Sequence, residues 1–178
     1  IEQLDIDGVI EPVVGENPNY SCAISGTGYT VNTAYDNGTY AINGMCWYDV
    51  TFDMWMKPNM TFQIGHEYKV FVDVKTEDGY EFYTTSVGGS YPPEGWGYIN
   101  GNYATLGMQY DARNEQSLSW TFTCQPKTVK SVAISGLNVP MDGSKPDFTA
   151  NTDSDYYTVD SIEWMDHTNG TDMTADDT

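Results

Sequence analysis

The residues best suited to binding a ligand lie in one glycine- and proline-rich segment, Ser86–Tyr98. It reads SVGGSYPPEGWGY and contains Tyr91, Glu94, Trp96 and Tyr98. Flat aromatic rings can stack on the C–H faces of a sugar, and a nearby carboxylate can accept hydrogen bonds from its hydroxyls. The segment is therefore a candidate carbohydrate-binding platform. The interpretation that we favour from the sequence is that Trp96 folds back as an apolar plug over one end of the fold.

Catalytic chemistry is not indicated by the residue pattern. The two histidines are His66, which precedes an expected strand and is expected to be solvated, and His167, which lies in an acidic stretch. Neither belongs to a recognisable Ser/His/Asp or Cys/His set. The 26 acidic residues contain no pair that stands out as the two carboxylates of a glycosidase. We therefore expect a protein that is not an enzyme.

Two aspartate-rich stretches, Asn151–Asp155 and Asp166–Asp172, are weakly suggestive of calcium, which prefers clustered oxygen ligands. Neither fits the twelve-residue EF-hand loop, because the bidentate glutamate is missing. We expect solvated acidic surfaces there, with no metal and no cofactor.

The three cysteines, Cys22, Cys46 and Cys124, allow at most one intrachain disulfide and have no zinc-site spacing. Each lies on the apolar side of its expected strand. Two of them could pair in an oxidising compartment, or all three could be small buried side chains.

The charge balance excludes whole classes of partner. Seven Lys and Arg stand against 26 Asp and Glu in 178 residues, for a formal charge of −19. Nucleic acids and anionic membrane surfaces would be repelled. No apolar run is long enough to insert into a bilayer. A hydrophobic content of 39% is nevertheless enough for a folded core.

Alternation of apolar and polar residues, rather than helical periodicity, organises the chain. It predicts strands over Glu67–Lys75, Ser117–Cys124 and Cys46–Trp55. In the last of these, Trp47 and Trp55 fall on the polar face, where we expect them to cover the outer sheet or cap strand ends. Turn sequences separate the runs, which favours an all-β, antiparallel, Ig-like β-sandwich.

An internal repeat divides the sequence. Residues 1–12 are restated at 129–140, and four Gly and Pro identities recur 128 residues later. These pairs are Gly8 and Gly136, Pro12 and Pro140, Gly15 and Gly143, and Pro18 and Pro146. Trp47 finds its counterpart in Trp164 once about eleven extra residues are allowed before it.

The repeat predicts a complete module at 1–125, followed by a linker and the start of a second, truncated repeat at 126–178. Half of an all-β module cannot easily close its own core. The second copy is thus expected to belong to a longer array, or to pack on the first copy or on another chain.

Several short motifs occur in a defined order: TFQIGHEY at 61–68, DGYEF at 78–82, ING at 99–101 and LSWTF at 118–122. Their order and spacing resemble a repeat of large surface proteins of Gram-positive gut bacteria, whose motifs are F-x-x-G-x-x-Y, GYxF and VNG. The resemblance covers nearly all of residues 1–125 and the beginning of the second copy. The segments 35–45 and 86–98 are longer than that pattern.

The resemblance implies a tandem Ig-like β-sandwich repeat on a secreted or cell-wall-attached protein, without a catalytic residue set. We therefore expect a non-catalytic, extracellular spacer whose partners are neighbouring repeats of the same polypeptide. The alternative is an adhesive or carbohydrate-binding module that contacts a glycan or a host surface protein through Tyr91, Glu94, Trp96 and Tyr98.

Overall fold

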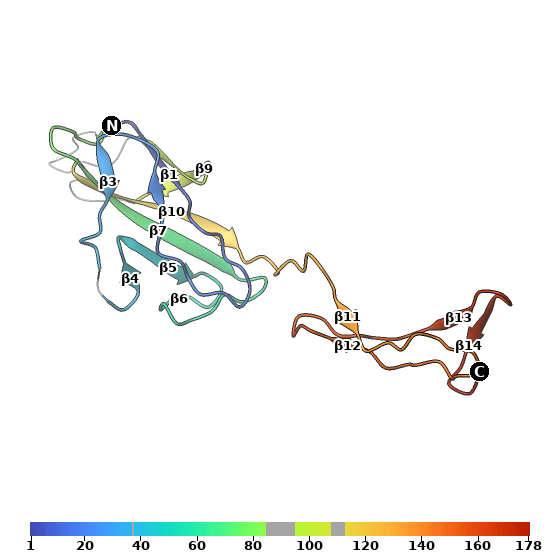
Figure 1. Cartoon of the computed structure of the whole chain (residues 1–178). Helices are drawn as coiled ribbons and strands as arrows, with labels where there is room; N and C mark the ends of the chain where they lie inside the picture. The colour runs from blue at the N-terminus through green and yellow to red at the C-terminus, as the bar shows by residue number, and fades with distance from the viewer. Residues whose placement is uncertain (37, 85–94, 108–112) are drawn as a thin grey trace. The chain divides into compact units, whose positions relative to one another are not determined.

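The computed structural model describes the whole chain except residues 37, 85–94 and 108–112 (Figure 1). The described residues form strands and connecting loops, and none of their segments is a helix long and apolar enough to cross a membrane. The chain divides into two compact units, Ile1–Lys127 and Thr128–Thr178. The predicted all-β class is confirmed.

The described residues of the first unit form ten strands in one curled sheet. The strands are β1 (Gln3–Asp7), β2 (Ala23–Ile24), β3 (Tyr29–Val31), β4 (Ala41–Ile42), β5 (Met45–Asp49), β6 (Met54–Trp55), β7 (Glu67–Thr76), β8 (Trp96–Ile99), β9 (Asn102–Leu106) and β10 (Glu115–Thr123). Their order is β2-β1-β8-β9-β10-β7-β5-β4, with β3 beside β7 and β6 beside β5.

The sheet is mixed, so the prediction of a purely antiparallel fold is wrong. β1 and β8 run parallel, with Leu4 opposite Gly97 and Ile6 opposite Ile99. Every other pair of named strands in this unit is antiparallel, among them the long β7–β10 pair that runs through the unit in Figure 1. Alternation within a segment reports which side chains face the core, but it carries no information about the direction of the neighbouring strand.

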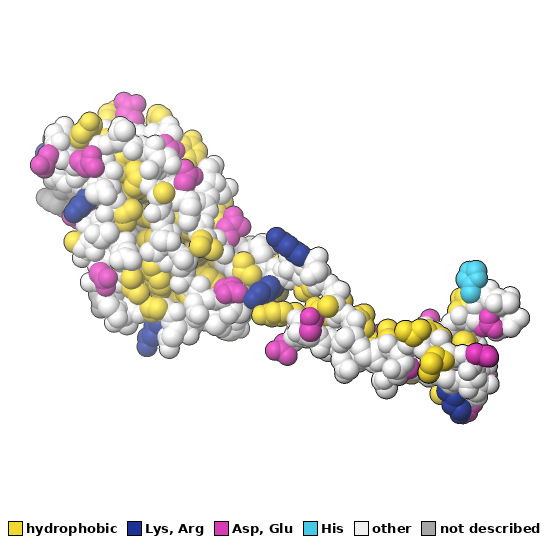
Figure 2. Space-filling view, in the orientation of Figure 1, with side chains coloured by type: hydrophobic (Ala, Val, Ile, Leu, Met, Phe, Trp, Pro, Cys, Tyr) yellow, Lys and Arg dark blue, Asp and Glu magenta, His cyan; other side chains and the backbone are white. Residues whose placement is uncertain are grey.

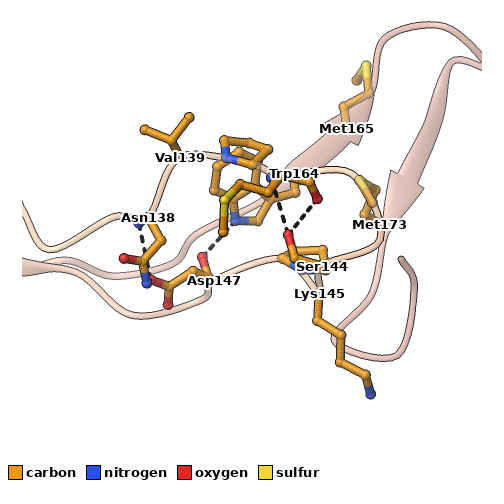
Figure 3. A pocket seen from close by; sticks show the side chains of 11 residues that line it. Asn138, Val139, Ser144, Lys145, Asp147, Trp164, Met165 and Met173 are labelled. Atoms are coloured by element: carbon orange, nitrogen blue, oxygen red, sulfur yellow. Dashed lines mark hydrogen bonds between the residues drawn. The ribbon is translucent and has the colours of Figure 1, made fainter.

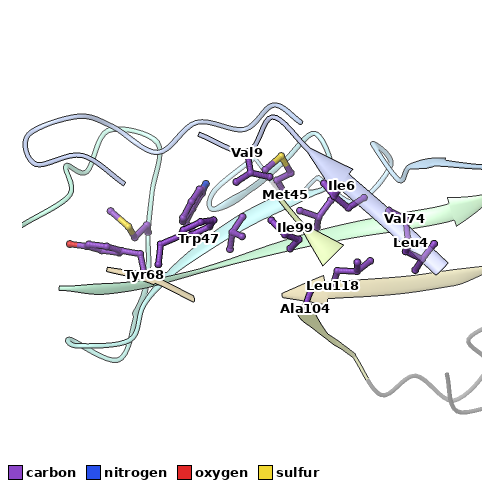
Figure 4. Close-up of a cluster of buried hydrophobic side chains, with 14 of the residues drawn as sticks. Leu4, Ile6, Val9, Met45, Trp47, Tyr68, Val74, Ile99, Ala104 and Leu118 are labelled. Carbon is purple, nitrogen blue, oxygen red and sulfur yellow. The ribbon is translucent and has the colours of Figure 1, made fainter. Parts of the chain in front are cut away.

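The core lies where the β1–β8–β9 part of the sheet folds over β10, β7 and β5 (Figure 4). Four alternate side chains of β7 are fully buried, as the alternation predicts: Tyr68, Val70, Val72 and Val74. Leu4 and Ile6 of β1 and Leu118 of β10 enclose the same space. Each buried aliphatic or aromatic side chain contributes about 1.5–3 kcal/mol, so this layer stabilises the unit.

The run Cys46–Trp55 is not one strand, which corrects a second prediction. β5 ends at Asp49, the chain turns, and β6 pairs back on β5. Asp53 closes the turn with φ 55°, a left-handed conformation that Asp tolerates better than most residues. Trp47, within β5, faces the core and is fully buried, instead of lying on a polar outer face as expected.

The second unit contains two short antiparallel strand pairs. β11 (Ile134–Ser135) pairs with β12 (Asn151–Thr152), and β13 (Trp164–Asp166) pairs with β14 (Thr171–Met173). In the first pair Ile134 lies opposite Thr152. Ile6 and Ile24 oppose each other in β1 and β2, each 128 positions earlier. The two units thus begin with the same strand pairing.

A tyrosine contact is common to both units. The hydroxyl of Tyr29 accepts a hydrogen bond from the backbone N–H of Asp5 at 2.7 Å. The hydroxyl of Tyr157 accepts one from the backbone N–H of Ala133 at 3.0 Å. Both members are shifted by 128 residues, so the same ring ties the same strand in each unit.

A tryptophan contact recurs in the same way. Trp47 Nε1 donates to the carbonyl oxygen of Asn19 at 2.8 Å, and Trp164 Nε1 donates to that of Asp147 at 2.7 Å. Asp147 stands 128 positions after Asn19, whereas Trp164 stands 117 after Trp47. The first unit therefore accommodates its extra residues between these two points without changing the contact.

The turn after each tryptophan strand is also shared. Asp49 Oδ1 accepts from the backbone N–H of Phe52 at 2.9 Å, and Asp166 Oδ1 accepts from that of Asn169 at 3.2 Å. Both positions are offset by 117, as are the paired residues of β13 and β14 relative to β5 and β6. The second unit thus repeats the part of the first that contains β1, β2, β5 and β6.

Candidate functional site

The aromatic candidates that the structure describes lie on β8. Tyr91 and Glu94 are outside the described residues. Trp96 and Tyr98 point outward, whereas the intervening Gly97 and the following Ile99 are buried. Trp96 is 41% exposed, so its ring lies on the surface and does not plug the core. Alternation about Gly97 is what places both aromatic rings on one face.

Parallel pairing with β1 gives Trp96 its polar neighbours. Its backbone N–H donates to the carbonyl oxygen of Glu2 at 3.0 Å, and its Nε1 donates to Gln3 Oε1 at 3.0 Å. The other end of the Gln3 amide donates to both carboxylate oxygens of Asp5 at 2.9 and 3.0 Å. A ring, an amide and a carboxylate therefore form a hydrogen-bonded row across the two strands.

An open hollow of about 330 Å³ lies beside this row, lined by Gln3, Asp5, Ile6, Asp7, Ser25, Tyr98 and Gly101. Tyr98 is the register partner of Asp5, and its ring meets the edge of Tyr103 at 5.8 Å between centroids. Two carboxylates, Asp5 and Asp7, and the partly exposed ring of Tyr98 in the lining give this hollow the chemistry to contact a sugar. Gln3, Asp5 and Tyr103 were not predicted, because their place depends on pairing between distant segments.

A second exposed aromatic cluster was also missed, on the outer face of β5, β6 and β7. Trp55 is 40% exposed and stacks on Tyr40 at 5.1 Å, while its ring also meets Tyr48 and Phe71. Lys69 Nζ lies 5.2 Å from the centre of the Phe71 ring. The prediction that Trp55 covers the outer sheet agrees with this arrangement. The sequence indicated this cluster only through the aromatic residues Tyr48, Trp55 and Phe71, which stand at outward-facing positions of their strands.

His66 is not the solvated turn residue that was expected. Its Nδ1 lies 3.1 Å from Oδ2 of the buried Asp49, and its ring packs edge-on against Phe52 at 4.4 Å. The other oxygen of Asp49 accepts the Phe52 backbone N–H. This carboxylate therefore connects the β5–β6 turn to the start of β7, which is a structural role.

The acidic stretches of the second unit are also engaged in local structure. Asp166 accepts hydrogen bonds from the backbone N–H groups of Thr168 and Asn169 and from the Asn169 amide, and these bonds lower the pKa of its carboxyl. Within the described part of the chain, no group of three or more His, Cys, Asp or Glu side chains is placed to hold a metal ion. His167 is exposed in the same turn.

The three cysteines are free thiols. Cys46 and Cys124 are buried as predicted, while Cys22 is partly exposed. Burial raises the pKa of the Cys46 thiol to about 12 and that of Cys22 to about 11. Because the thiolate is the reactive species, these protonated thiols are unreactive at neutral pH.

Comparison with known proteins found no match: no family model, no curated protein and no solved structure matches this chain.

Proposed function

We propose that this chain is a non-catalytic structural repeat, an Ig-like spacer of an extracellular bacterial surface protein. One observation carries the proposal: the indole–carbonyl contact of Trp47 recurs at Trp164 with the same partner position, in a unit that repeats the same strand pairs. Proteins that repeat one supersecondary unit along the chain commonly use it to build extended arrays.

The state of the reactive side chains supports this role. His66 is bound to a turn-forming aspartate, and Asp166 satisfies its own turn. The Cys46 thiol is held protonated by burial. Residues that are occupied in this way maintain the fold and are not poised for acid–base or nucleophilic chemistry.

The placement on a bacterial surface rests on the order of the motifs from TFQIGHEY to LSWTF and on the acidic charge. A net charge of −19 keeps neighbouring modules soluble and apart through mutual repulsion. The partners in this proposal are neighbouring repeats of the same polypeptide.

The face formed by Trp96, Tyr98, Gln3 and Asp5 favours a second candidate function, adhesion to a glycan or a glycosylated host surface protein. Exposed aromatic rings beside a hollow with carboxylates are the specific observation behind it. Tyr91 and Glu94, the other two candidates for this function, lie outside the described residues.

A glycan array separates the two functions. The spacer role predicts no binding by the native chain to host or plant glycans. The controls are Trp96→Ala and Trp55→Ala, which remove tryptophans of nearly equal exposure from two different faces. Binding that Trp96→Ala abolishes and Trp55→Ala preserves would replace the spacer role with the adhesive one.

A further inference from the structure

The second unit has an open hollow where the first has its core. The hollow measures about 550 Å³ and is lined by Val139, Pro140, Met141, Trp164 and Met173 among others. Figure 3 shows Trp164 among the residues that line the hollow, with the Ser144 hydroxyl hydrogen-bonded to the backbone of Met141. Figure 2 shows apolar side chains gathered along the surface of this unit.

The apolar residues of this unit stand at positions that are core positions in the first. Val132, Ile134 and Leu137 are 60%, 54% and 45% exposed, whereas their counterparts 128 residues earlier, Leu4, Ile6 and Val9, are 3%, 1% and 4% exposed. The apolar character is kept although the side chains are uncovered. Such a large uncovered apolar face indicates an interaction surface.

The first unit shows what covers the tryptophan at this place. The Trp47 ring contacts Phe62 at 5.4 Å and Phe122 at 6.1 Å between centroids. Residues 128–178, all of which the structure describes, contain no counterpart of either ring around Trp164, which is half-buried. The hollow of the second unit thus lies where counterparts of Phe62 and Phe122 would contact Trp164.

In the second unit, β13 also lacks a neighbouring strand beside Trp164. In the first unit β5 lies between β6 and β7, and Trp47 is opposite Val70. In the second unit, which is described in full, β13 pairs with β14 alone. The edge of β13 that corresponds to the β7 side of β5 thus has unpaired N–H and C=O groups, and such an edge accepts an added strand.

In the first unit, the segment before β7 occupies the place that corresponds to the rest of the hollow. Phe62 exchanges two backbone hydrogen bonds with Gly15 and Glu16, both at 2.9 Å. The position equivalent to Glu16 is Ser144, which lines the hollow. A single segment equivalent to residues 61–76 would therefore fill the space beside Trp164 and pair with β13.

We propose that the second unit is a receptor for one β-strand of the β7 type, an extended segment with an aromatic residue at its start and apolar side chains at alternate positions. The strand adds antiparallel to the open edge of β13 and covers Trp164. This inference rests on the repeat relationship within the proposed function. The strand, and not a second copy of the chain, is the occupant, because the first unit fills the equivalent space with this segment.

The test uses the full 178-residue chain and a fluorescein-labelled peptide with the sequence of residues 61–76, TFQIGHEYKVFVDVKT. Fluorescence anisotropy measures binding, and hydrogen exchange measures protection of β13. A control peptide carries Val70→Thr and Val72→Thr, which keep the β-forming shape and remove the apolar face. The variant Trp164→Ala is matched by Val129→Ala, an exposed apolar residue of the same unit outside the hollow.

We expect saturable binding with slower exchange at residues 162–166. Trp164→Ala and the threonine peptide should each weaken binding about tenfold or more, the effect of removing an interface anchor, while Val129→Ala binds like the native chain. Hydrogen exchange on the native chain keeps the test valid if Trp164→Ala loosens its unit.

Absence of peptide binding, or equal binding by Trp164→Ala, would overturn the inference. So would a dimer of the chain alone that Trp164→Ala disrupts, because the occupant would then be a second copy. The spacer proposal is tested separately, since the glycan array is read at Trp96 on the first unit.

Discussion

Replacing Trp47 with alanine should destabilise the first unit far more than the same change at Trp164 affects the chain. Trp47 is fully buried, contacts Phe62 and Phe122, and donates to the carbonyl of Asn19. Truncating a buried tryptophan to alanine costs about 3–5 kcal/mol. The Asn19 carbonyl also loses its partner, which places the expected loss at the upper end of that range.

A second substitution separates packing from hydrogen bonding. Trp47→Phe keeps an aromatic ring between Phe62 and Phe122 but removes the Nε1 donor, so we expect a loss of about 1–3 kcal/mol. Trp164→Ala removes a half-buried ring that borders an open hollow, and should cost about 1 kcal/mol or less.

Urea unfolding provides the measurement, with the free energy of unfolding obtained from the midpoint and slope of the transition. Far-UV circular dichroism follows all variants without depending on the substituted tryptophan. A loss below about 1 kcal/mol for Trp47→Ala, or equal losses for Trp47→Ala and Trp164→Ala, would be inconsistent with the different burial of the two rings.

Three further predictions follow from the first unit. Burial raises the pKa of the Asp73 carboxyl from 3.8 to about 6, so the folded state holds this proton more tightly and its contribution to stability is lost as pH rises from about 4 through 6. Asp73→Asn should therefore reduce the dependence of the free energy of unfolding on pH. At pH 7 it should raise that free energy by about 1 kcal/mol, a figure reduced for the partial exposure of the side chain. Urea unfolding at pH 4 and pH 7 measures this, and an unchanged pH dependence would contradict it. Gly44 has φ 75°, and a Cβ there would lie 2.7 Å from the Asn32 carbonyl oxygen, so Gly44→Ala should lower the free energy of unfolding by about 1–3 kcal/mol; Gly65→Ala, which shares the positive φ but meets no atom, isolates the steric part. Cys46 should react with a thiol reagent at pH 7 only in urea, and rapid labelling of the native chain at this position, located by mass spectrometry, would be inconsistent with its burial.

The local part of the fold was predictable from alternation. β7 buries Tyr68 and Val70 on the expected face, because its pattern has no interruption. The prediction of a single strand over Cys46–Trp55 was wrong, because the alternation of apolar and polar residues continues through a turn that contains no glycine. Asp53 supplies the left-handed conformation there, and single-residue patterns do not distinguish such an aspartate from one on a strand.

The candidate site was predictable only in part. Trp96 and Tyr98 are two positions apart on a strand and therefore lie on one face, which can be predicted from the sequence alone. Their neighbours Gln3 and Asp5 come from a strand some ninety residues away that runs parallel to β8. Such pairing depends on the whole topology, and no local pattern encodes it.

The two units repeat one architecture, and nuclear magnetic resonance of the full chain can detect the shared contacts in each of them. We expect NOEs from the Trp164 indole N–H to Asp147 and Phe148, and from the Tyr157 ring to the Ala133 amide. The equivalent contacts of Trp47 with Asn19 and of Tyr29 with Asp5 should give matching NOEs in the first unit. Random-coil shifts throughout residues 128–178, or a Trp164 indole with NOEs to a different strand, would contradict it.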